Sequence, residues 1–389
     1  MTADALAAMD DWGPEKIVCV ADRRTGMRGV LVIDNTSRGM GKGGTRMGPH
    51  VSVGEISRLA RSMTWKWAAV DLFFGGAKAG IVGDPRGHDK EAMLRSFARA
   101  LSNEVPAEYV FGLDMGLTEA DAAILADEIG GRDAAVGLPS ALGGLPYDEL
   151  GITGFGVAEV VDAATDHLGI ELKGGRVAIE GFGAVGQAAA QRLVELGAVI
   201  VAVSTVHGAV HDPNGLAVDE LVHASAEAGD DFVKHVGRPL LATGALAQVE
   251  ADVLVPAARE DTIDEAMAHR ITARLVVEGA NMPTTSGARA VLRRRGITVI
   301  PDFIANAGGA VAAAHAMDMR HSAFVVDPTS VLETVSAKLR TNAAHVLRHA
   351  HDHDGDPREV ALALARSRVR EAMLQRGHVP RPDWGVGTR

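Results

Sequence analysis

The sequence contains one cysteine, Cys19, among 389 residues. An intrachain disulfide is therefore excluded, and nothing indicates a secreted scaffold held by disulfides. No apolar run approaches the roughly 20 residues that a membrane-spanning helix needs. The first residues, MTADALAAMDDWGPEK, carry acidic side chains where a signal peptide needs a basic flank. These absences predict a cytoplasmic protein.

Lysine is also scarce, with 8 lysines against 31 arginines. A chain that prefers arginine for a bare positive charge makes its remaining lysines candidates for a chemical role, because an ammonium changes its protonation state more readily on burial. The formal net charge of −11 argues against a nucleic-acid or anionic-membrane partner. The length predicts two domains.

The pattern of apolar residues divides the chain into three parts. The first 150 residues combine strand-like runs at 16–20 and 29–33 with helical periodicity at 53–70, 91–101 and 118–129. Glycine-dense segments at 39–44, 75–80 and 137–146 are expected to be loops. From residue 173, β-branched runs alternate with helices, which predicts a parallel, doubly wound sheet. After Ala314 the pattern is helical, with a polar break at 351–357.

A nucleotide-binding motif follows the first of these β-branched runs. The sequence GRVAIEGFGAVGQAAAQRL places a strand before Gly181, Gly183 and Gly186, and a helix after them. Such glycines permit a tight turn, a close approach to a pyrophosphate and the packing of helix on strand. The start of the helix, Ala184 and Val185, offers free N–H groups to phosphate. We therefore expect a bound dinucleotide.

The choice between NAD and NADP stays open. The second strand ends in Ser204, Thr205, Val206 and His207, without the carboxylate that usually binds the adenosine ribose. This absence favours NADP, because it removes a clash with the 2′-phosphate. However, no arginine stands beside the strand to hold that phosphate.

Two lysines lie twelve residues apart in MTWKWAAVDLFFGGAKAG. Lys66 falls in an expected helix and Lys78 in a glycine-rich turn, where the apolar neighbours Phe73 and Phe74 argue against an ordinary solvated charge. Lys42 lies in another glycine turn. Asp114, in VFGLDMG, stands before a predicted helix, where it is either a catalytic carboxylate or a helix cap.

These segments resemble the glutamate/leucine/phenylalanine/valine dehydrogenase superfamily. The resemblance covers about residues 28–310 and rests on GGTRM, MTWKWAAVDLFFGGAKAGI, VFGLDMG, GITGFGV, GFGAVG, ADVLVPAA, VVEGANMPTT and IPDFIANAGG, in the family's order. It implies reversible oxidative deamination of an L-amino acid to a 2-oxo acid and ammonia, with hydride transfer to NAD or NADP.

The resemblance also implies a role for each matching residue. Lys78 would act in its neutral form on the attacking water and stabilise the carbinolamine oxygen, and Asp114 would shuttle protons. Lys66 would hold the substrate α-carboxylate. The remaining positions would line the substrate pocket (Asn306), touch the nicotinamide half of the cofactor (Thr153, Asn281) or border its adenosine side (Pro256, Ala257), near Thr205.

The family's architecture gives the expected domains. Residues 1–150 would form a substrate-binding and oligomerisation domain, residues 151–329 a Rossmann-type dinucleotide domain, and residues 330–389 helices that return to the first domain. A cleft between such domains closes on the substrate by hinge motion. Homo-oligomers, commonly hexamers or octamers, are the rule in the family.

Two positions bear on the substrate. Lys42 matches the lysine that glutamate enzymes use for the side-chain carboxylate, which favours glutamate, since a buried ammonium would repel an aliphatic side chain. Ala313 departs from the serine that glutamate enzymes place there. Glutamate, another amino acid, and a non-catalytic regulatory homologue therefore remain as alternatives.

Other chemistries find less support. A 2-hydroxy-acid dehydrogenase would use a histidine–carboxylate pair, and His207 and His211 lie beyond the second strand instead. A metal site could be built only from residues 349–354 (HAHDHD), which we expect to be a solvated loop, so no metal is predicted.

Overall fold

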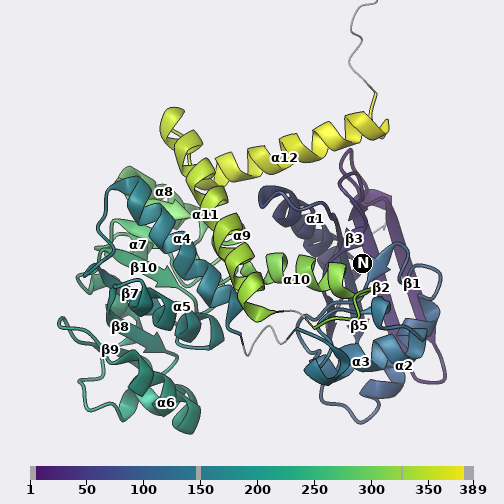
Figure 1. Cartoon of the computed structure of the whole chain (residues 1–389), viewed down its shortest axis with the longest axis horizontal. Coiled ribbons are helices and arrows are strands. Elements are labelled where there is room, and N and C mark those ends of the chain that lie inside the picture. Colours follow the sequence, from purple (N-terminus) through teal and green to yellow (C-terminus); the bar gives the residue numbers. More distant parts are fainter. Residues whose placement is uncertain (1–5, 146–149, 326, 381–389) are drawn as a thin grey trace, which may run out of the picture. The chain divides into compact units, whose positions relative to one another are not determined.

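The computed structural model describes residues 6–145, 150–325 and 327–380, and the chain forms two compact units (Figure 1). Unit 1 comprises Met1–Pro146, Ala313–Asp327 and Leu362–Arg389, and unit 2 comprises Tyr147–Ala312 and Pro328–Ala361. The chain crosses between the units four times, and two of these crossings lie inside helices, α10 (Gly308–Met319) and α12 (Pro357–Arg376).

Unit 1 contains a mixed sheet in the order β1-β2-β5-β3-β6, with β4 also paired to β5. The first three strands in this order are antiparallel, whereas β3 and β4 run parallel to β5, and β6 runs parallel to β3. Its strands are β1 (Lys16–Asp22), β2 (Met27–Asn35), β3 (Gly41–Lys42), β4 (Thr45–Gly48), β5 (Gly75–Val82) and β6 (Tyr109–Val110). The expected strands at 16–20 and 29–33 are confirmed as β1 and β2.

Helices cover both faces of this sheet. They are α1 (Val53–Ala69), α2 (Lys90–Ala100) and α3 (Glu119–Ile129), as the periodicity predicted, with short 3₁₀ turns η1 (Leu6–Ala8), η2 (Arg132–Ala134) and η3 (Ser140–Leu142). Successive residues of β2 point to opposite faces. Val30 and Val32 pack with α1 in a small apolar cluster, and Leu31 and Ile33 join the main core with α2 and α3. Unit 1 is therefore a three-layer α/β domain.

Two glycine-dense segments expected to be loops are strands instead. Residues 75–80 lie in β5 and residues 41–42 form β3, so Lys78 and Lys42 are strand residues. The reason is visible at Gly76, where an added Cβ would lie 2.4 Å from the backbone oxygen of Ala60 and 2.0 Å from Thr64 Oγ1 of α1. Glycine in this strand permits close approach of the helix backbone.

Unit 2 contains a Rossmann-type sheet in the order β12-β11-β10-β7-β8-β9. All strands are parallel except β9, which pairs antiparallel with β8 at the edge. The strands are β7 (Arg176–Glu180), β8 (Val199–Thr205), β9 (Gly208–His211), β10 (Val253–Pro256), β11 (Leu275–Val277) and β12 (Thr298–Ile300). The order reverses at β7, and in such sheets ligands bind at the carboxyl ends of the strands beside the reversal.

The helices of unit 2 alternate with these strands as predicted. They are α4 (Ile152–Leu168), α5 (Ala184–Glu195), α6 (Val218–Ala228), α7 (Glu265–Ala268), α8 (Ser286–Arg294), α9 (Asp302–Ala305) and α11 (Pro328–Asp352), with 3₁₀ turns η4 (Gly229–Lys234) and η5 (Thr243–Gln248). The long helix α11 packs on α4 (Figure 1). Helices α11 and α12 are separated at the expected polar break.

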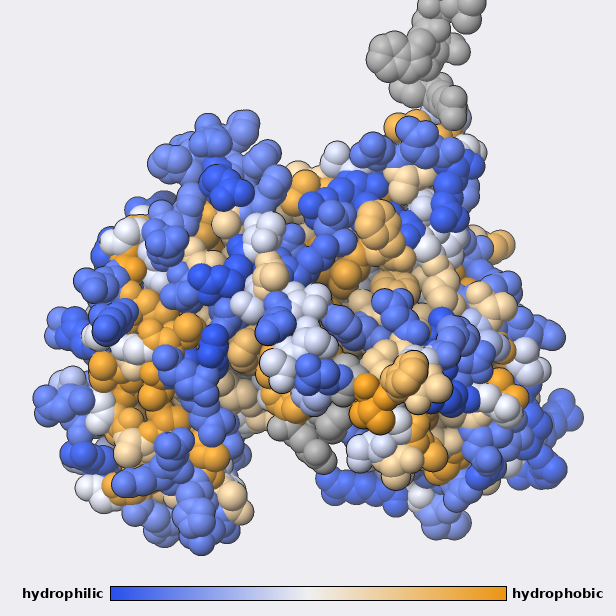
Figure 2. All heavy atoms as spheres, in the orientation of Figure 1, coloured by the Kyte–Doolittle hydropathy of each residue, from blue (hydrophilic) through white to orange (hydrophobic). Residues whose placement is uncertain are grey.

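The surface is mixed in character. On the face shown in Figure 2, hydrophobic residues gather over the part of unit 2 that holds β7, β8 and α5, between hydrophilic helix ends. Exposed large apolar side chains of unit 2 include Val206, Leu240 and Met282. Among the described residues, no helix is both long and apolar enough to cross a membrane.

Candidate active site

Lys78 and Asp114 meet in unit 1. Lys78 lies in the middle of β5, and its Nζ is 2.7 Å from Oδ2 of Asp114, which follows β6 along the chain. The two side chains are only 9% and 20% exposed. The alternative of Asp114 as a helix cap is wrong, because Thr118 caps α3 in a capping box with Asp121. Asp114 is thus available as a partner of Lys78.

A second cation, Arg46 of β4, binds the same carboxylate. Its Nε donates to Asp114 Oδ2 at 3.0 Å, and its Nη1 donates to Glu55 Oε1 at 2.6 Å. Burial alone would raise the pKa of Asp114, but Lys78 and Arg46 outweigh it and hold that pKa below its usual value. Sequence reasoning missed Arg46, although it stands in the GGTRM motif, because only the fold brings β4 beside Asp114.

Lys42 is a buried cation. Its side chain is enclosed with the residue 2% exposed, and its Nζ donates to the Val110 carbonyl at 3.1 Å. The Trp67 indole holds the Lys42 backbone through a hydrogen bond of 2.8 Å. Burial, followed by the positive charges of Arg320 and Lys78, lowers the pKa of Lys42 to about 7. Among the described residues no carboxylate pairs with this ammonium. The site therefore suits an anionic group supplied by a ligand.

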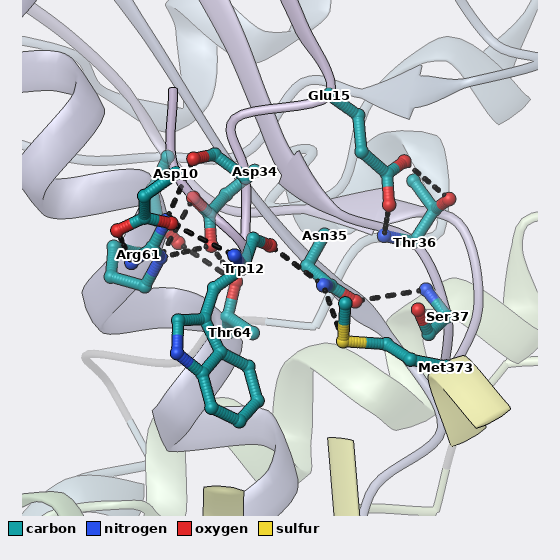
Figure 3. Close-up of polar contacts among 12 residues, drawn as sticks. Asp10, Trp12, Glu15, Asp34, Asn35, Thr36, Ser37, Arg61, Thr64 and Met373 are labelled. Atoms are coloured by element: carbon teal, nitrogen blue, oxygen red, sulfur yellow. Dashed lines mark hydrogen bonds and ion pairs between the residues drawn. The ribbon is translucent and has the colours of Figure 1, made fainter. Parts of the chain in front are cut away.

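Lys66 lies half-buried on α1, two residues beyond Thr64. A buried network shown in Figure 3 fixes this part of the helix to β2. Asp34 of β2 is fully buried and accepts hydrogen bonds from Arg61 Nε, at 2.9 Å to each oxygen, and from Thr64 Oγ1 at 2.5 Å. Arg61 also binds Asp10 at 2.9 and 3.1 Å. Two ion pairs and a buried hydroxyl therefore set the position of α1 one turn before Lys66.

Two further residues of unit 1 come from α10. Ala313 is half-buried where α10 enters this unit. Arg320 follows the helix end, and its guanidinium donates to the carbonyls of Met317 and Asp133, each at 3.0 Å. Sequence reasoning did not single out Arg320, which nevertheless acts on the charge of Lys42. Unit 1 thus brings together Lys42, Lys78 and Asp114 with two arginines that the sequence pattern did not mark.

The glycine motif in unit 2 has the geometry of a nucleotide-binding turn. Gly181 follows β7 with φ +86°, and an added Cβ would lie 2.5 Å from Ala258 Cα, so only glycine fits. Gly183 is the N-cap of α5, and no atom lies within 4 Å of the place its Cβ would take. Ala184, Val185 and Gly186 form the first turn of α5. Open space therefore faces free N–H groups at a helix N-terminus, as a phosphate requires.

This turn opens into a pocket of about 610 Å³ at the carboxyl ends of β7, β8 and β10. That volume lies within the range of small-molecule sites. Pro256 is the last residue of β10, next to Ala257. Four of the predicted cofactor residues line the pocket: Gly181, Gly183, Thr205 and Ala257. The pocket is also lined by Glu180, Asp230 and Arg259, which sequence reasoning did not identify. The residues present fit a dinucleotide.

Three other predicted residues lie in unit 2. Asn306 is 5% exposed, and its amide donates to Asn281 Oδ1 at 3.0 Å and to the carbonyls of Gly279 and Ala280 at 3.3 Å. Thr153 lies on α4, with its Oγ1 3.3 Å from the Cβ position of Gly309. The two asparagines are therefore in contact, and Thr153 packs beside the glycine pair that follows Asn306.

The histidines considered for other chemistries are placed elsewhere. His211 lies in β9, and His207 forms a 3.3 Å ion pair with Asp231 in which both side chains are largely exposed. His349 and His353 belong to a row of rings that stack along α11 and its end. In the part of the chain that the structure describes, no group of three or more potential ligands could hold a metal ion.

A sheet with a nucleotide pocket and a buried lysine–aspartate pair together define a nicotinamide-dependent dehydrogenase. Sequence comparison agrees with this class: residues 143–377 match the family Glutamate/Leucine/Phenylalanine/Valine dehydrogenase, and residues 14–130 match the Glu/Leu/Phe/Val dehydrogenase dimerisation domain. The chain belongs to this family and is an NAD(P)-dependent amino-acid dehydrogenase.

Individual relatives point the same way. The NAD-specific glutamate dehydrogenase of Staphylococcus aureus is 33% identical over 88% of this chain and 84% of the relative. The NADP-specific glutamate dehydrogenase of Saccharolobus shibatae is 33% identical over 96% and 92%. A crystal structure of hetero-hexameric glutamate dehydrogenase from Thermus thermophilus superimposes with a TM-score of 0.82 at 32% identity, covering 96% of this chain and 93% of that one.

Proposed function

We propose that this enzyme catalyses the reversible oxidative deamination of L-glutamate to the 2-oxo acid and ammonia. The observation that carries the reaction type is the buried contact of 2.7 Å between Lys78 and Asp114. Gly181, Gly183 and the first turn of α5 would hold the nicotinamide dinucleotide, which would supply the acceptor for the hydride of the substrate Cα. The proton transfers are carried out by side chains of unit 1.

Lys78 and Asp114 divide the proton chemistry. Loss of hydride leaves an imine, water adds to it, and the carbinolamine that forms releases ammonia. Lys78 takes a proton from the attacking water and, as an ammonium, stabilises the oxygen of the carbinolamine. Asp114 moves protons to and from the nitrogen that leaves. The guanidinium of Arg46, 3.0 Å from Asp114, keeps this carboxylate ionised between transfers.

The remaining groups position the substrate. Lys66 holds the α-carboxylate as a point charge and so orients Cα–H. Asn306 would line the substrate and nicotinamide pocket, and Thr153 and Asn281 would touch the nicotinamide half of the cofactor. Lys42 supports glutamate as the substrate, because a buried ammonium without a carboxylate partner becomes favourable when the substrate supplies one. Ala313, which has no hydroxyl, adds nothing to that recognition. A dehydrogenase for another amino acid is the second candidate.

We also infer that the protein works as a cytoplasmic homo-oligomer of six or eight copies. The dimerisation domain that residues 14–130 match supports self-association, and the related Thermus thermophilus enzyme is a hetero-hexamer. The proposed partners of the chain are otherwise small molecules: an amino acid, its 2-oxo acid, ammonia and a nicotinamide dinucleotide.

Lys78→Ala tests the reaction type. We expect this variant to lose at least about a thousandfold in kcat with every amino acid, because it lacks the proton acceptor and the charge that stabilises the intermediate. NADH should still bind, because its pocket lies in unit 2, and fluorescence titration of the bound dinucleotide measures this. Lys173→Ala, which removes an exposed lysine just before β7 in unit 2, is the control and should keep full activity.

The substrate is tested with a panel of L-amino acids, each with NAD and with NADP, followed at the absorbance of the reduced nicotinamide. We expect the highest kcat/KM with glutamate. Full activity of Lys78→Ala would contradict the proposed mechanism. A clear preference for an aliphatic amino acid would contradict glutamate as the substrate but leave the reaction type unchanged.

A further inference from the structure

We propose that Asp230 makes this enzyme select NAD over NADP. The inference rests on the proposed use of the unit 2 pocket by a dinucleotide. The second strand of the motif, β8, ends without a carboxylate, but the fold supplies one to the same pocket from η4, 25 residues further along the chain. A carboxylate beside the adenosine ribose accepts hydrogen bonds from its hydroxyls and repels a 2′-phosphate.

Thr205 fixes η4 at the end of β8. It is the last residue of the strand and only 5% exposed, and its Oγ1 donates to the Asp230 carbonyl at 2.9 Å. The same oxygen accepts from the His207 backbone N–H at 3.2 Å. The hydroxyl proton of Thr205 is therefore engaged in the hydrogen bond to Asp230. This bond holds in place the residue whose side chain is the carboxylate.

Two neighbouring aspartates of η4, Asp230 and Asp231, differ in their charged partners. Asp231 is paired with Lys234 and with His207. Asp230, by contrast, forms no ion pair with any residue that the structure describes, and it is an exposed residue among those that line the pocket. Its negative charge is therefore not neutralised by a neighbouring cation.

The rest of the pocket wall does not compensate for this charge. The carboxylates Glu180 and Asp261 also line the pocket, and the guanidinium present, Arg259, acts on Glu180 at the end of β7. A 2′-phosphate carries a charge of about −2 and needs cations around it. In the described part of the pocket wall none stands at the end of β8, so the absence of a carboxylate in β8 itself does not make this an NADP site.

The test is direct binding of NADH and NADPH to the full-length protein, followed by the fluorescence of the bound nicotinamide. We expect the unmodified protein to bind NADH at least about tenfold more tightly than NADPH, which is the effect of one partly screened like charge. In Asp230→Asn the ratio of the two dissociation constants should fall about tenfold, mainly because NADPH binds better. Added salt should narrow the ratio of the two dissociation constants more in the unmodified protein than in this variant.

Asp219→Asn is the matched control. It removes the same charge from an exposed position in the first turn of α6, and it should leave the ratio within about twofold of the unmodified value. Tighter binding of NADPH by the unmodified protein, or an unchanged ratio in Asp230→Asn, would overturn the proposal. If neither dinucleotide binds, the pocket itself is wrongly assigned and Asp230 with it. If NADH is preferred while no amino acid is oxidised, only the proposed reaction fails.

Discussion

Lys42 and Lys78 of unit 1 differ in what surrounds them, and their surroundings separate their roles. Lys78 has a carboxylate at 2.7 Å and Lys42 has a carbonyl at 3.1 Å. A buried ammonium whose described partners include no anion is costly to the folded protein. Such a group persists where a ligand supplies the missing charge. Lys42, which has no described carboxylate partner, is therefore the lysine that identifies the substrate.

Lys42→Leu should therefore raise KM for glutamate by about ten- to a hundredfold, the cost of losing a hydrogen bond between charged groups. L-norvaline has an uncharged side chain, and its KM should stay equal or fall. Steady-state kinetics on the two substrates give this comparison directly. An unchanged KM for glutamate would remove the basis for naming it.

The same residue gives the enzyme a dependence on pH. The pKa of Lys42 falls from 10.5 to about 7, mainly by burial, so the folded protein releases this proton before the unfolded chain does. Its buried charge lowers stability below about pH 7, and that cost disappears as the pH rises towards 10.5. KM for glutamate should rise above about pH 7 as the free enzyme loses the ammonium. In Lys42→Leu the pH profile of KM should be flat.

At the scale of elements, the packing of α1 on β2 and β5 sets the position of Lys66. Thr64 contributes a 2.5 Å hydrogen bond to a carboxylate that is fully buried, and the glycine at position 76 leaves the space that its side chain occupies. Thr64→Val keeps the shape of the side chain and removes this bond. It should lower the free energy of unfolding by about 1–3 kcal/mol, because Asp34 stays buried.

A matched control for this variant is a separate hydrogen-bonded pair drawn in the same view (Figure 3). Thr36 donates a 2.6 Å bond to Glu15 in an exposed position, so Thr36→Val should change the free energy of unfolding by less than about 0.5 kcal/mol. Urea unfolding followed by tryptophan fluorescence measures both variants, since Trp12, Trp65 and Trp67 all belong to unit 1. Equal effects of the two substitutions would contradict a structural role for the buried bond.

Helices and parallel strands were predictable because their apolar periodicity is local. The pattern at 53–70 gave α1 within one residue, and five β-branched runs gave five strands of the Rossmann-type sheet. Glycine-rich segments carry no such periodicity, so β3 and β5 resembled loops in the sequence. In β5, the close approach of α1 at Gly76 explains why glycine stands in a strand. Arg46 and Asp230 were missed for a related reason: each reaches its site only when separate segments pack together.

At the scale of the whole chain, two of the four passages between the two units fall inside helices, α10 and α12. Helical periodicity continues through both, so no local signal marks where one unit ends and the other begins. The sequence alone predicted boundaries at 150 and 330, at changes of pattern, whereas compactness divides the chain at Ala313 and Leu362 as well.

Self-association should use the free edge of the unit 1 sheet. Strand β1 ends the sheet, and among the described residues it pairs with β2 alone, so its outer N–H and C=O groups are open to another strand. A symmetric dimer joins identical surfaces, and two antiparallel copies of Lys16–Asp22 in register would place the central residue, the exposed Cys19, opposite its own counterpart. Because this is the chain's one cysteine, the arrangement can be tested without engineering a probe.

Light scattering should give a mass that is an even multiple of 40.6 kDa. A short bismaleimide should then link protomers in pairs under native conditions, because two thiols lie close across each interface. Neither Cys19→Ser nor protein dissociated in urea should yield the linked dimer. A native assembly of the expected mass that reacts with single maleimides but forms no linked pair would show that the copies associate through another surface, leaving the β1 edge free.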